Sequence, residues 1–202
     1  MTIILPLEII SEILISLDDL SLCIQLKDNY SANKVYNKNQ HSFSSVCKKG
    51  QLEVLKWLHM NNKSYCSILA MDYASENGHL EVVKWLHKNR TKGYNTINAM
   101  NWASCNGHLE VVKWLHKNRT EGCTTWAMNF ASRYGYLEVV KFLHENRTEG
   151  CTTSAMDYAS ENGQLKVVKW LHENRSEGCT RYAMDWAAEN GHSEIVKFLK
   201  LI

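Results

Sequence analysis

Three cysteines are the most suggestive chemical groups in this 202-residue sequence, because they recur at a fixed interval. Cys123, Cys151 and Cys179 are 28 residues apart, a register that could gather thiols for a disulfide bond or a zinc site. Equivalent residues on neighbouring packed helices lie about 8–10 Å apart, whereas disulfide-bonded Cα atoms lie within about 7 Å and Zn–S bonds measure about 2.3 Å. We therefore predict free thiols that act as small, half-buried loop side chains.

Histidine, the commonest metal-binding side chain, recurs in two series. The first series stands at the end of a predicted helix, where a histidine can bond the last carbonyl groups: His59, His87, His116, His144 and His172. The second series follows a glycine and is explained by the geometry of the turn: His79, His108 and His192. Equivalent histidines on neighbouring helices are also about 8–10 Å apart, too far to share a metal ion, so we predict no metal site.

Familiar catalytic motifs are absent from the sequence. It contains no C-x-x-C, H-E-x-x-H or G-x-x-x-x-G-K-[ST] pattern and no nucleophile elbow. The adjacent acids Asp18 and Asp19 precede an apolar run, a placement more typical of a helix cap than of acid–base catalysis. We predict no catalytic residues, no cofactor and no enzymatic activity.

The charge balance and the apolar runs exclude further classes of function. Lys plus Arg number 23 and Asp plus Glu number 21, so a net charge of +2 gives no electrostatic reason to bind nucleic acid or an anionic membrane. No apolar run reaches the ~18–20 residues of a membrane helix. Seven cysteines without an export signal favour a reducing compartment. We expect an intracellular monomer, cytoplasmic or nuclear, and neither nucleic acid nor membrane as its partner.

The elements that carry these residues are internal repeats. An Ala-Met pair returns at steps of 29, 28, 28 and 28 residues: Ala70-Met71, Ala99-Met100, Ala127-Met128, Ala155-Met156 and Ala183-Met184. Glycines keep the same period: Gly50, Gly78, Gly107, Gly135, Gly163 and Gly191. Six glycines indicate six units, at about 42–69, 70–98, 99–126, 127–154, 155–182 and 183–202. The first unit is degenerate.

Each unit predicts two short helices separated by its glycine, as in 155–162 and 80–88. Isolated helices shorter than ~12–15 residues are marginal in water, so the order must come from stacking. We expect an all-α solenoid. Aromatic residues at one second-helix position should be buried in it: Trp57, Trp85, Trp114, Phe142, Trp170 and Phe198. For such a core position, Trp114→Ala should cost ~3–5 kcal/mol.

Residues 74–86, Ala-Ser-Glu-Asn-Gly-His-Leu-Glu-Val-Val-Lys-Trp-Leu, resemble the helix-turn-helix part of the ankyrin repeat. The resemblance extends over about 160 residues in six copies. The family's T-P-L-H opening is absent and the period is 28 rather than about 33 residues. We therefore expect shortened loops that turn at Gly93, Gly122, Gly150 and Gly178 in place of full β-hairpins. The residue pattern of the units is similar to that of ankyrin arrays in large DNA viruses and some protists. This resemblance would imply a host-cell location if the protein is viral.

Residues 1–40 lack the repeat and allow two interpretations. Asp18 or Asp19 can cap a helix at 20–26, so the segment can act as a helical cap over the first repeat. It also resembles the start of an F-box, and that resemblance implies docking to a cullin-ligase linker protein. The F-box-like positions are Leu5, Pro6, Ile9, Ile13, Leu14 and Leu17.

Side chains that differ between near-identical units are the candidate binding residues, because the scaffold does not need them. In the family that this sequence resembles, the loop end and the first helix face the partner. Aromatic and arginine side chains, typical of binding hot spots, replace small or polar ones at some of these positions: Trp126, Arg133, Tyr134, Tyr136, Arg181 and Tyr182. We predict a non-catalytic protein–protein interaction scaffold; the alternative is an F-box-type substrate receptor for a cullin-based ubiquitin ligase.

Overall fold

The computed structural model describes residues 19–39, 42–61, 69–89 and 97–202, and all regular structure within these ranges is helical. The first helices of the units are α4 (Phe43–Lys48), α6 (Ala70–Glu76), α8 (Asn98–Cys105), α10 (Thr125–Arg133), α12 (Ser154–Glu161) and α14 (Arg181–Glu189). The second helices are α5 (Leu52–Met60), α7 (Leu80–Asn89), α9 (Leu109–Asn118), α11 (Leu137–Asn146), α13 (Leu165–Asn174) and α15 (Ser193–Leu199). The expectation of an all-α solenoid is confirmed.

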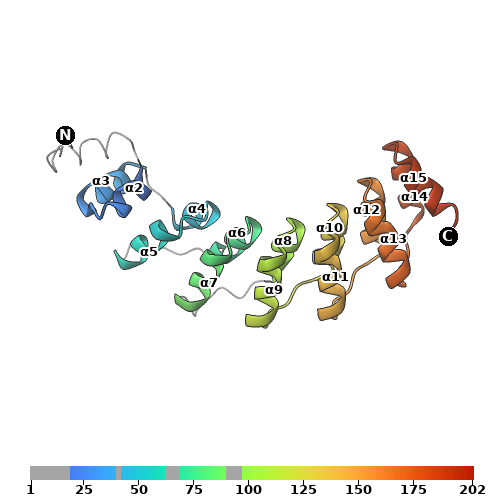
Figure 1. Ribbon diagram of the computed structural model, residues 1–202, viewed down its shortest axis with the longest axis horizontal. Coiled ribbons are helices and arrows are strands. Elements are labelled where there is room, and N and C mark those ends of the chain that lie inside the picture. Colours follow the sequence, from blue (N-terminus) through green and yellow to red (C-terminus); the bar gives the residue numbers. More distant parts are fainter. Residues whose placement is uncertain (1–18, 40–41, 62–68, 90–96) are drawn as a thin grey trace, which may run out of the picture.

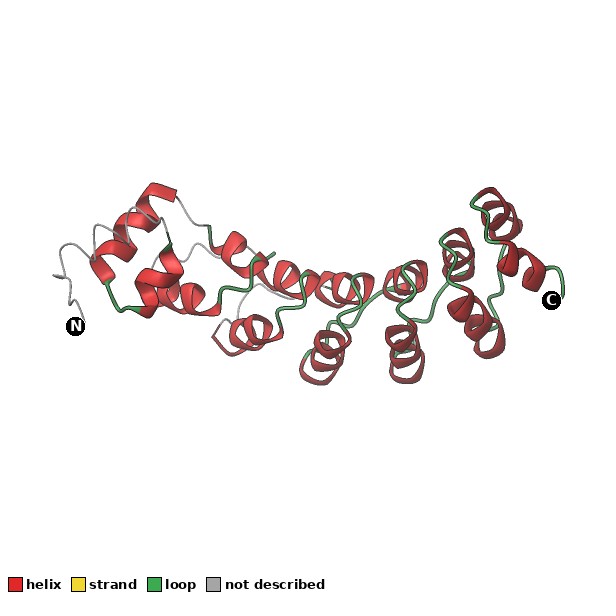
Figure 2. Ribbon diagram, turned by 45° about the horizontal axis from the view of Figure 1, so that its top comes forward, coloured by secondary structure: helices red, strands yellow, loops and turns green. Residues whose placement is uncertain are grey.

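The helices form two layers along an elongated molecule (Figure 1). Figure 2 shows the first helices in one layer and the second helices in the other, with loops running between them. Alanines spaced by four on the first helices are buried, as Ala99 and Ala103 are on α8 and Ala127 and Ala131 are on α10. Because small side chains allow close approach, first helices contact one another more extensively than second helices do.

The turn between the two helices of a unit depends on a glycine with positive φ. At Gly107 φ is 74°, in the left-handed region that glycine adopts at little cost. The next residue, His108, donates its backbone N–H to the carbonyl of Ala103 at 2.9 Å, closing the end of α8. Its imidazole Nε2 lies 3.0 Å from the carbonyl oxygen of Glu76 in the preceding unit. The histidine that follows the glycine therefore links two repeats in addition to completing a turn.

Asparagines close the second helices, and here the sequence prediction for histidine is wrong. The Asn118 side-chain amide donates to the carbonyl of Trp114 at 2.8 Å, and Asn89 bonds Trp85 in the same way at 2.9 Å. The expected capping residue His87 instead places its ring edge-on to Trp114 of the next unit, 5.1 Å between centroids. The same contact recurs along the second layer: His59–Trp85, His116–Phe142, His144–Trp170 and His172–Phe198.

The aromatic stripe of the second helices is half-buried, which corrects the expectation that all of it lies in the core. Trp57 is buried, whereas Trp85, Trp114, Phe142, Trp170 and Phe198 pack against the core with one face only. Valine and leucine fill the interior instead, as Val111, Val112 and Leu115 do in α9. The stripe is partly exposed because no third layer covers the outer side of the second helices in the described structure.

The loops between units are short, and the described ones contain no strand. The expected turns at Gly122, Gly150 and Gly178 are confirmed by φ values of 75°, 69° and 67°, whereas Gly93 lies outside the described residues. Each of these loops is tied to the first helix of its own unit. The Asn101 amide oxygen accepts the backbone N–H of Thr124 at 3.0 Å, and Asn129 binds Thr152 with the same length.

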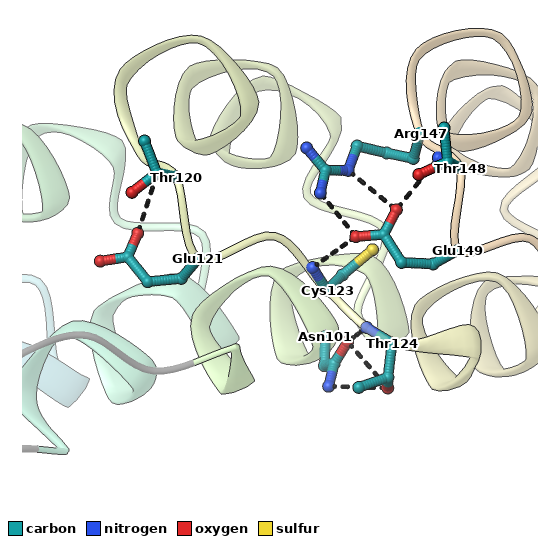
Figure 3. A network of polar contacts seen from close by, with 8 residues as sticks. All are labelled: Asn101, Thr120, Glu121, Cys123, Thr124, Arg147, Thr148 and Glu149. Carbon is teal, nitrogen blue, oxygen red and sulfur yellow. Dashed lines mark hydrogen bonds and ion pairs between the residues drawn. The ribbon is translucent and has the colours of Figure 1, made fainter.

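An arginine–glutamate pair of the next unit covers the loops at Gly122 and Gly150, and Figure 3 shows the first of them. Arg147 and Glu149 form a bidentate ion pair, with Nη2 of the arginine 2.5 Å from Oε1 of the glutamate. The same carboxylate accepts the backbone N–H of Cys123, one unit earlier, at 3.1 Å. A Cβ at Gly122 would lie 2.4 Å from Arg147 Nη2, so the glycine also leaves room for the guanidinium.

Two of the three loop cysteines are packed against the structure, as predicted. Cys123 and Cys151 are buried free thiols, while Cys179 is exposed. Burial, with the nearby charge of Glu149, raises the pKa of Cys123 to about 12. The thiol is therefore protonated at neutral pH and unreactive.

Residues 20–39 form two helices, α2 (Leu20–Gln25) and α3 (Asn29–Asn39). Of the two capping candidates, Asp19 caps α2, accepting the backbone N–H of Leu22 at 3.0 Å. Helix α2 packs on α3 and on α5 of the first unit, with Leu20 and Cys23 buried. The F-box-like positions Leu5, Pro6, Ile9, Ile13, Leu14 and Leu17 all lie outside the described residues.

Adjacent residues of α9 provide a test of the packing. Leu115 is 2% exposed, whereas Trp114 is only half-buried. Leu115→Ala should lower the free energy of unfolding by about 3 kcal/mol, and Trp114→Ala by about 2 kcal/mol, because only the leucine leaves a closed cavity. Urea denaturation measures both. A tryptophan variant that loses more stability than the leucine variant would contradict the half-buried assignment.

The loop carboxylate Glu149 provides a test in acid. Burial alone would raise the pKa of Glu149, but hydrogen bonds from Arg147 and from the Cys123 amide outweigh it and hold that pKa at about 2, against an ordinary 4.5. The ionised group therefore stabilises the fold above pH 4.5, and this stabilisation is lost as the pH falls toward 2. Glu149→Gln should cost about 1–2 kcal/mol at pH 7 and much less at pH 3.

Urea denaturation at both pH values measures this difference, and Glu145→Gln is the matched control because Glu145 is exposed on α11. An equal loss in the two variants, or a loss for Glu149→Gln that does not depend on pH, would show that the carboxylate does not hold the loop.

Candidate functional site

The described residues hold no arrangement suited to metal chemistry or to crossing a membrane. Within residues 19–39, 42–61, 69–89 and 97–202, no three His, Cys, Asp or Glu side chains gather closely enough to bind a metal ion. No helix in these ranges has the length and apolar character that a bilayer span requires. The candidate site described below lies on the surface of the first-helix layer.

The first-helix layer displays a cluster of aromatic side chains, called here the aromatic face: Trp102, Trp126, Phe130, Tyr134, Tyr158, Tyr182 and Trp186. On α10, Trp126, Phe130 and Tyr134 are spaced by four residues and so share one flank of the helix. The opposite flank of α10, with Met128 and Ser132, is buried. The helical period alone thus presents these rings to solvent.

The rings of the aromatic face contact one another across three units. Phe130 lies 5.4 Å from Trp126 and 6.0 Å from Tyr158, measured between ring centroids. Trp186 stacks on Tyr182 at 5.1 Å and lies parallel to Tyr158 at 6.4 Å. Despite these contacts Trp126 is 60% exposed and Tyr182 is 53% exposed. The face therefore combines a fixed arrangement with a large amount of accessible apolar surface, which is typical of binding surfaces.

A hollow of about 160 Å³ lies between α8 and α10 within this face. Its wall consists of four rings, two amides and one thiol: Trp102, Trp126, Phe130, Tyr134, Asn98, Asn101 and Cys105. The amide of Asn101 is held by Thr124, which fixes one side of the hollow. None of these side chains carries a formal charge near neutral pH, because burial raises the pKa of the Cys105 thiol, an effect that Arg133 counters and Glu76 reinforces.

Arg133 lies within the face beside this hollow. Its guanidinium carbon is 5.1 Å from the centroid of Tyr158 and 5.9 Å from that of Tyr134. It also forms a 3.5 Å ion pair with Glu161 of α12. The arginine is therefore oriented between two units, with its charge offset by a carboxylate of the next one.

The structure brings together some of the predicted binding residues and separates others. Trp126, Arg133 and Tyr134 lie together on α10, and Tyr182 joins them through the row of rings. Tyr136 takes the place of the turn histidine: a Cβ at Gly107 would lie 2.4 Å from its ring, so it packs between units.

Arg181 directly precedes Tyr182, on the exposed surface of α14. It forms a 3.2 Å ion pair with Asp185 and is far from the hollow along the row of units.

The sequence prediction missed one residue in every unit of the aromatic face. One position of the first helix is aromatic in the last five units: Tyr73, Trp102, Phe130, Tyr158 and Trp186. Sequence reasoning sought the site only where the units differ. The helical spacing could have revealed this position. Ala99, Met100 and Ala103 are buried, whereas Trp102 lies outside their flank of the helix and is 43% exposed.

Comparison with known proteins agrees with this architecture. A family model described as "Ankyrin repeats (3 copies)" matches residues 43–125, 100–180 and 127–201, and so covers most of the chain. The crystal structure of the human ASB11 ankyrin repeat domain is similar, with a TM-score of 0.63 and 17% sequence identity over 79% of this chain and 82% of that one. A search of curated protein sequences found no significant match. Ankyrin repeats indicate a protein–protein interaction scaffold, a fold that is typically non-enzymatic, and this chain belongs to the ankyrin repeat family.

Proposed function

We propose that the protein binds a partner protein through the aromatic face, with Trp126, Arg133, Tyr134 and Tyr182 as the main contacts. The observation that carries the proposal is the row of contacting rings from α10 to α14, in which Trp126 and Tyr182 are exposed. Tyrosine, tryptophan and arginine are the side chains that most often dominate binding energy. The loops and the second layer are held by contacts that stabilise the fold, whereas these rings remain accessible.

Within a unit, the residues that hold the fold are different from those of the aromatic face, and this difference supports the proposal. The loop is fixed by residues such as Asn101 and Glu149, and the second layer by contacts such as His87 with Trp114. By contrast, Trp126 is replaced by Ser154 at the equivalent place in the next unit, so the repeat does not require a ring there. A large exposed tryptophan that the scaffold can do without is best explained by binding.

Site-directed photo-crosslinking identifies the partner and tests the face in one experiment. A photoreactive phenylalanine analogue replaces Trp126 in the full chain, and the same analogue replaces exposed Lys113 of α9 as the control. We expect a discrete crosslinked protein from position 126 and none from position 113. Crosslinks of the same protein from both positions, or only from 113, would contradict the proposal.

The array itself supplies substitutions that preserve the fold for an affinity measurement. Trp126→Ser introduces the residue found at position 154, and Arg133→Glu the residue found at positions 76, 161 and 189. Each change should weaken binding of the crosslinked partner at least tenfold, since hot-spot side chains contribute about 2 kcal/mol or more. Calorimetric titration measures the affinities; values unchanged in both variants, with the fold intact by circular dichroism, would eliminate the face.

A second candidate function, a substrate receptor of a cullin-based ubiquitin ligase, follows from the F-box-like pattern alone. Leu5, Pro6, Ile9, Ile13, Leu14 and Leu17 carry that pattern. In this function the segment would recruit the linker protein while the aromatic face holds the target. Helix α2 packs on α3 and on α5 of the first unit, so a test must leave these helices in place.

The full chain is therefore compared with an Ile9→Asp, Leu14→Asp variant in a pull-down with the purified linker protein. Binding by the parent, loss in this variant and retention in Ser11→Ala would support the receptor function. Failure of the parent to bind the linker protein would exclude it and leave the scaffold function intact.

A further inference from the structure

One position near the end of each first helix decides what fills the gap between neighbouring units. Counting by the repeat period, the residues at this position are Lys48, Glu76, Cys105, Arg133, Glu161 and Glu189. All but one are long and charged. The exception, Cys105, is the residue that lines the hollow between α8 and α10.

Where this position is basic, the side chain covers the aromatic ring of the next unit. Lys48 Nζ lies 6.0 Å from the centroid of Tyr73, and the guanidinium carbon of Arg133 lies 5.1 Å from that of Tyr158. In both of these pairs the ring lies 25 residues after the basic residue. The residue 25 positions after Cys105 is Phe130, so this is the equivalent ring. A thiol is too short to cover it, and the hollow of about 160 Å³ stands at this place.

Charge decides which kind of side chain from a partner can enter. In the two gaps that hold a cation, the helix bearing the covered ring ends in a carboxylate, Glu76 in α6 and Glu161 in α12. At the hollow, the helix that bears the equivalent ring is α10, and it ends in Arg133 instead of a carboxylate. The lining of the hollow holds no charged group that could pair with an entering lysine, arginine or carboxylate, and Arg133 beside it is already paired with Glu161 at 3.5 Å. Burying an unpaired charge there would be costly, so an uncharged side chain is favoured.

The size and lining of the hollow also favour one large uncharged side chain. A cavity of about 150 Å³ can hold a benzene ring, so the hollow matches one large side chain. Its four rings offer apolar contact, and the exposed amide of Asn98 at its edge can hydrogen-bond the backbone of a bound segment.

We infer that the hollow between α8 and α10 is an anchor pocket that receives one large uncharged side chain, such as phenylalanine or leucine, from a segment of the partner protein. The inference rests on the proposed function and narrows it, because it names the pocket within the face and the chemistry of the side chain that fills it. Cys105 makes the pocket by being short, and the uncharged lining makes it selective for an uncharged side chain.

Four small probes test the inference directly in the full chain. They are the acetylated α-amides of phenylalanine, leucine, arginine and glutamic acid, which differ only in the side chain. Titration is followed by NMR through the indole N–H signals of Trp102 and Trp126. We expect saturable shifts at millimolar concentrations for phenylalanine and leucine, with at least fivefold weaker binding of the arginine and glutamic acid probes.

Two variants separate the pocket from general apolar adhesion. Cys105→Glu places in the hollow the side chain that three other units carry at this position, so the fold is compatible with it. It should weaken the phenylalanine probe at least tenfold. Glu189→Ala, at the equivalent position of α14 and exposed, should leave the titration unchanged.

Several outcomes would overturn the inference. These are preferred binding of the arginine or glutamic acid probe, no saturable shift with any probe, an unchanged affinity in Cys105→Glu, or broadening of the two indole signals with protein concentration alone, which would assign the hollow to a second copy of the chain. The crosslinking and affinity measurements at Trp126 are independent of these probes, so a failed pocket and a failed binding face give different results.

Discussion

Each repeat in this protein depends on its neighbour for closure. Helices of six to ten residues do not persist alone in water, and the contacts that hold them here cross from one unit to the next. Alanines bring the first helices together, histidine rings meet the aromatic side chains of the following second helices, and Glu149 takes the amide of Cys123 from the unit before it. The stability of the array is therefore mainly a property of its interfaces.

Because each unit depends on contacts with its neighbour, different parts of the surface have different roles. The loops and the second layer are committed to contacts between units, which leaves one flank of each first helix without a structural role. On α8, α10, α12 and α14 that flank carries rings, with Arg133 held between Tyr158 and Glu161. A solenoid can change such residues freely, because Trp126 and Ser154 occupy the same place on equally well-packed helices. The scaffold and the binding surface can thus vary separately.

The repeat period contained most of the fold. It placed the helices within about one residue and located the turns at Gly122, Gly150 and Gly178, because those features arise from local backbone preferences. Contacts between units were less accessible to sequence reasoning. The partners of His87 and Glu149 lie in neighbouring units, and the exposure of Trp114 depends on whether another layer covers it. The hollow was missed because it depends on how a short residue, Cys105, faces the rings of the next unit, which the sequence does not show.

Hydrogen exchange of two loop amides tests most directly whether each unit is closed by the next. The amide of Cys123 donates to Glu149 of the following unit, whereas Cys179 is exposed and has no such pair after it in this sequence. Measured by NMR in the intact chain, the Cys123 amide should exchange at least a hundredfold more slowly than the Cys179 amide, and Glu149→Ala should remove most of that difference. Equal exchange at the two amides, or protection of Cys123 that survives the substitution, would contradict closure by the neighbour.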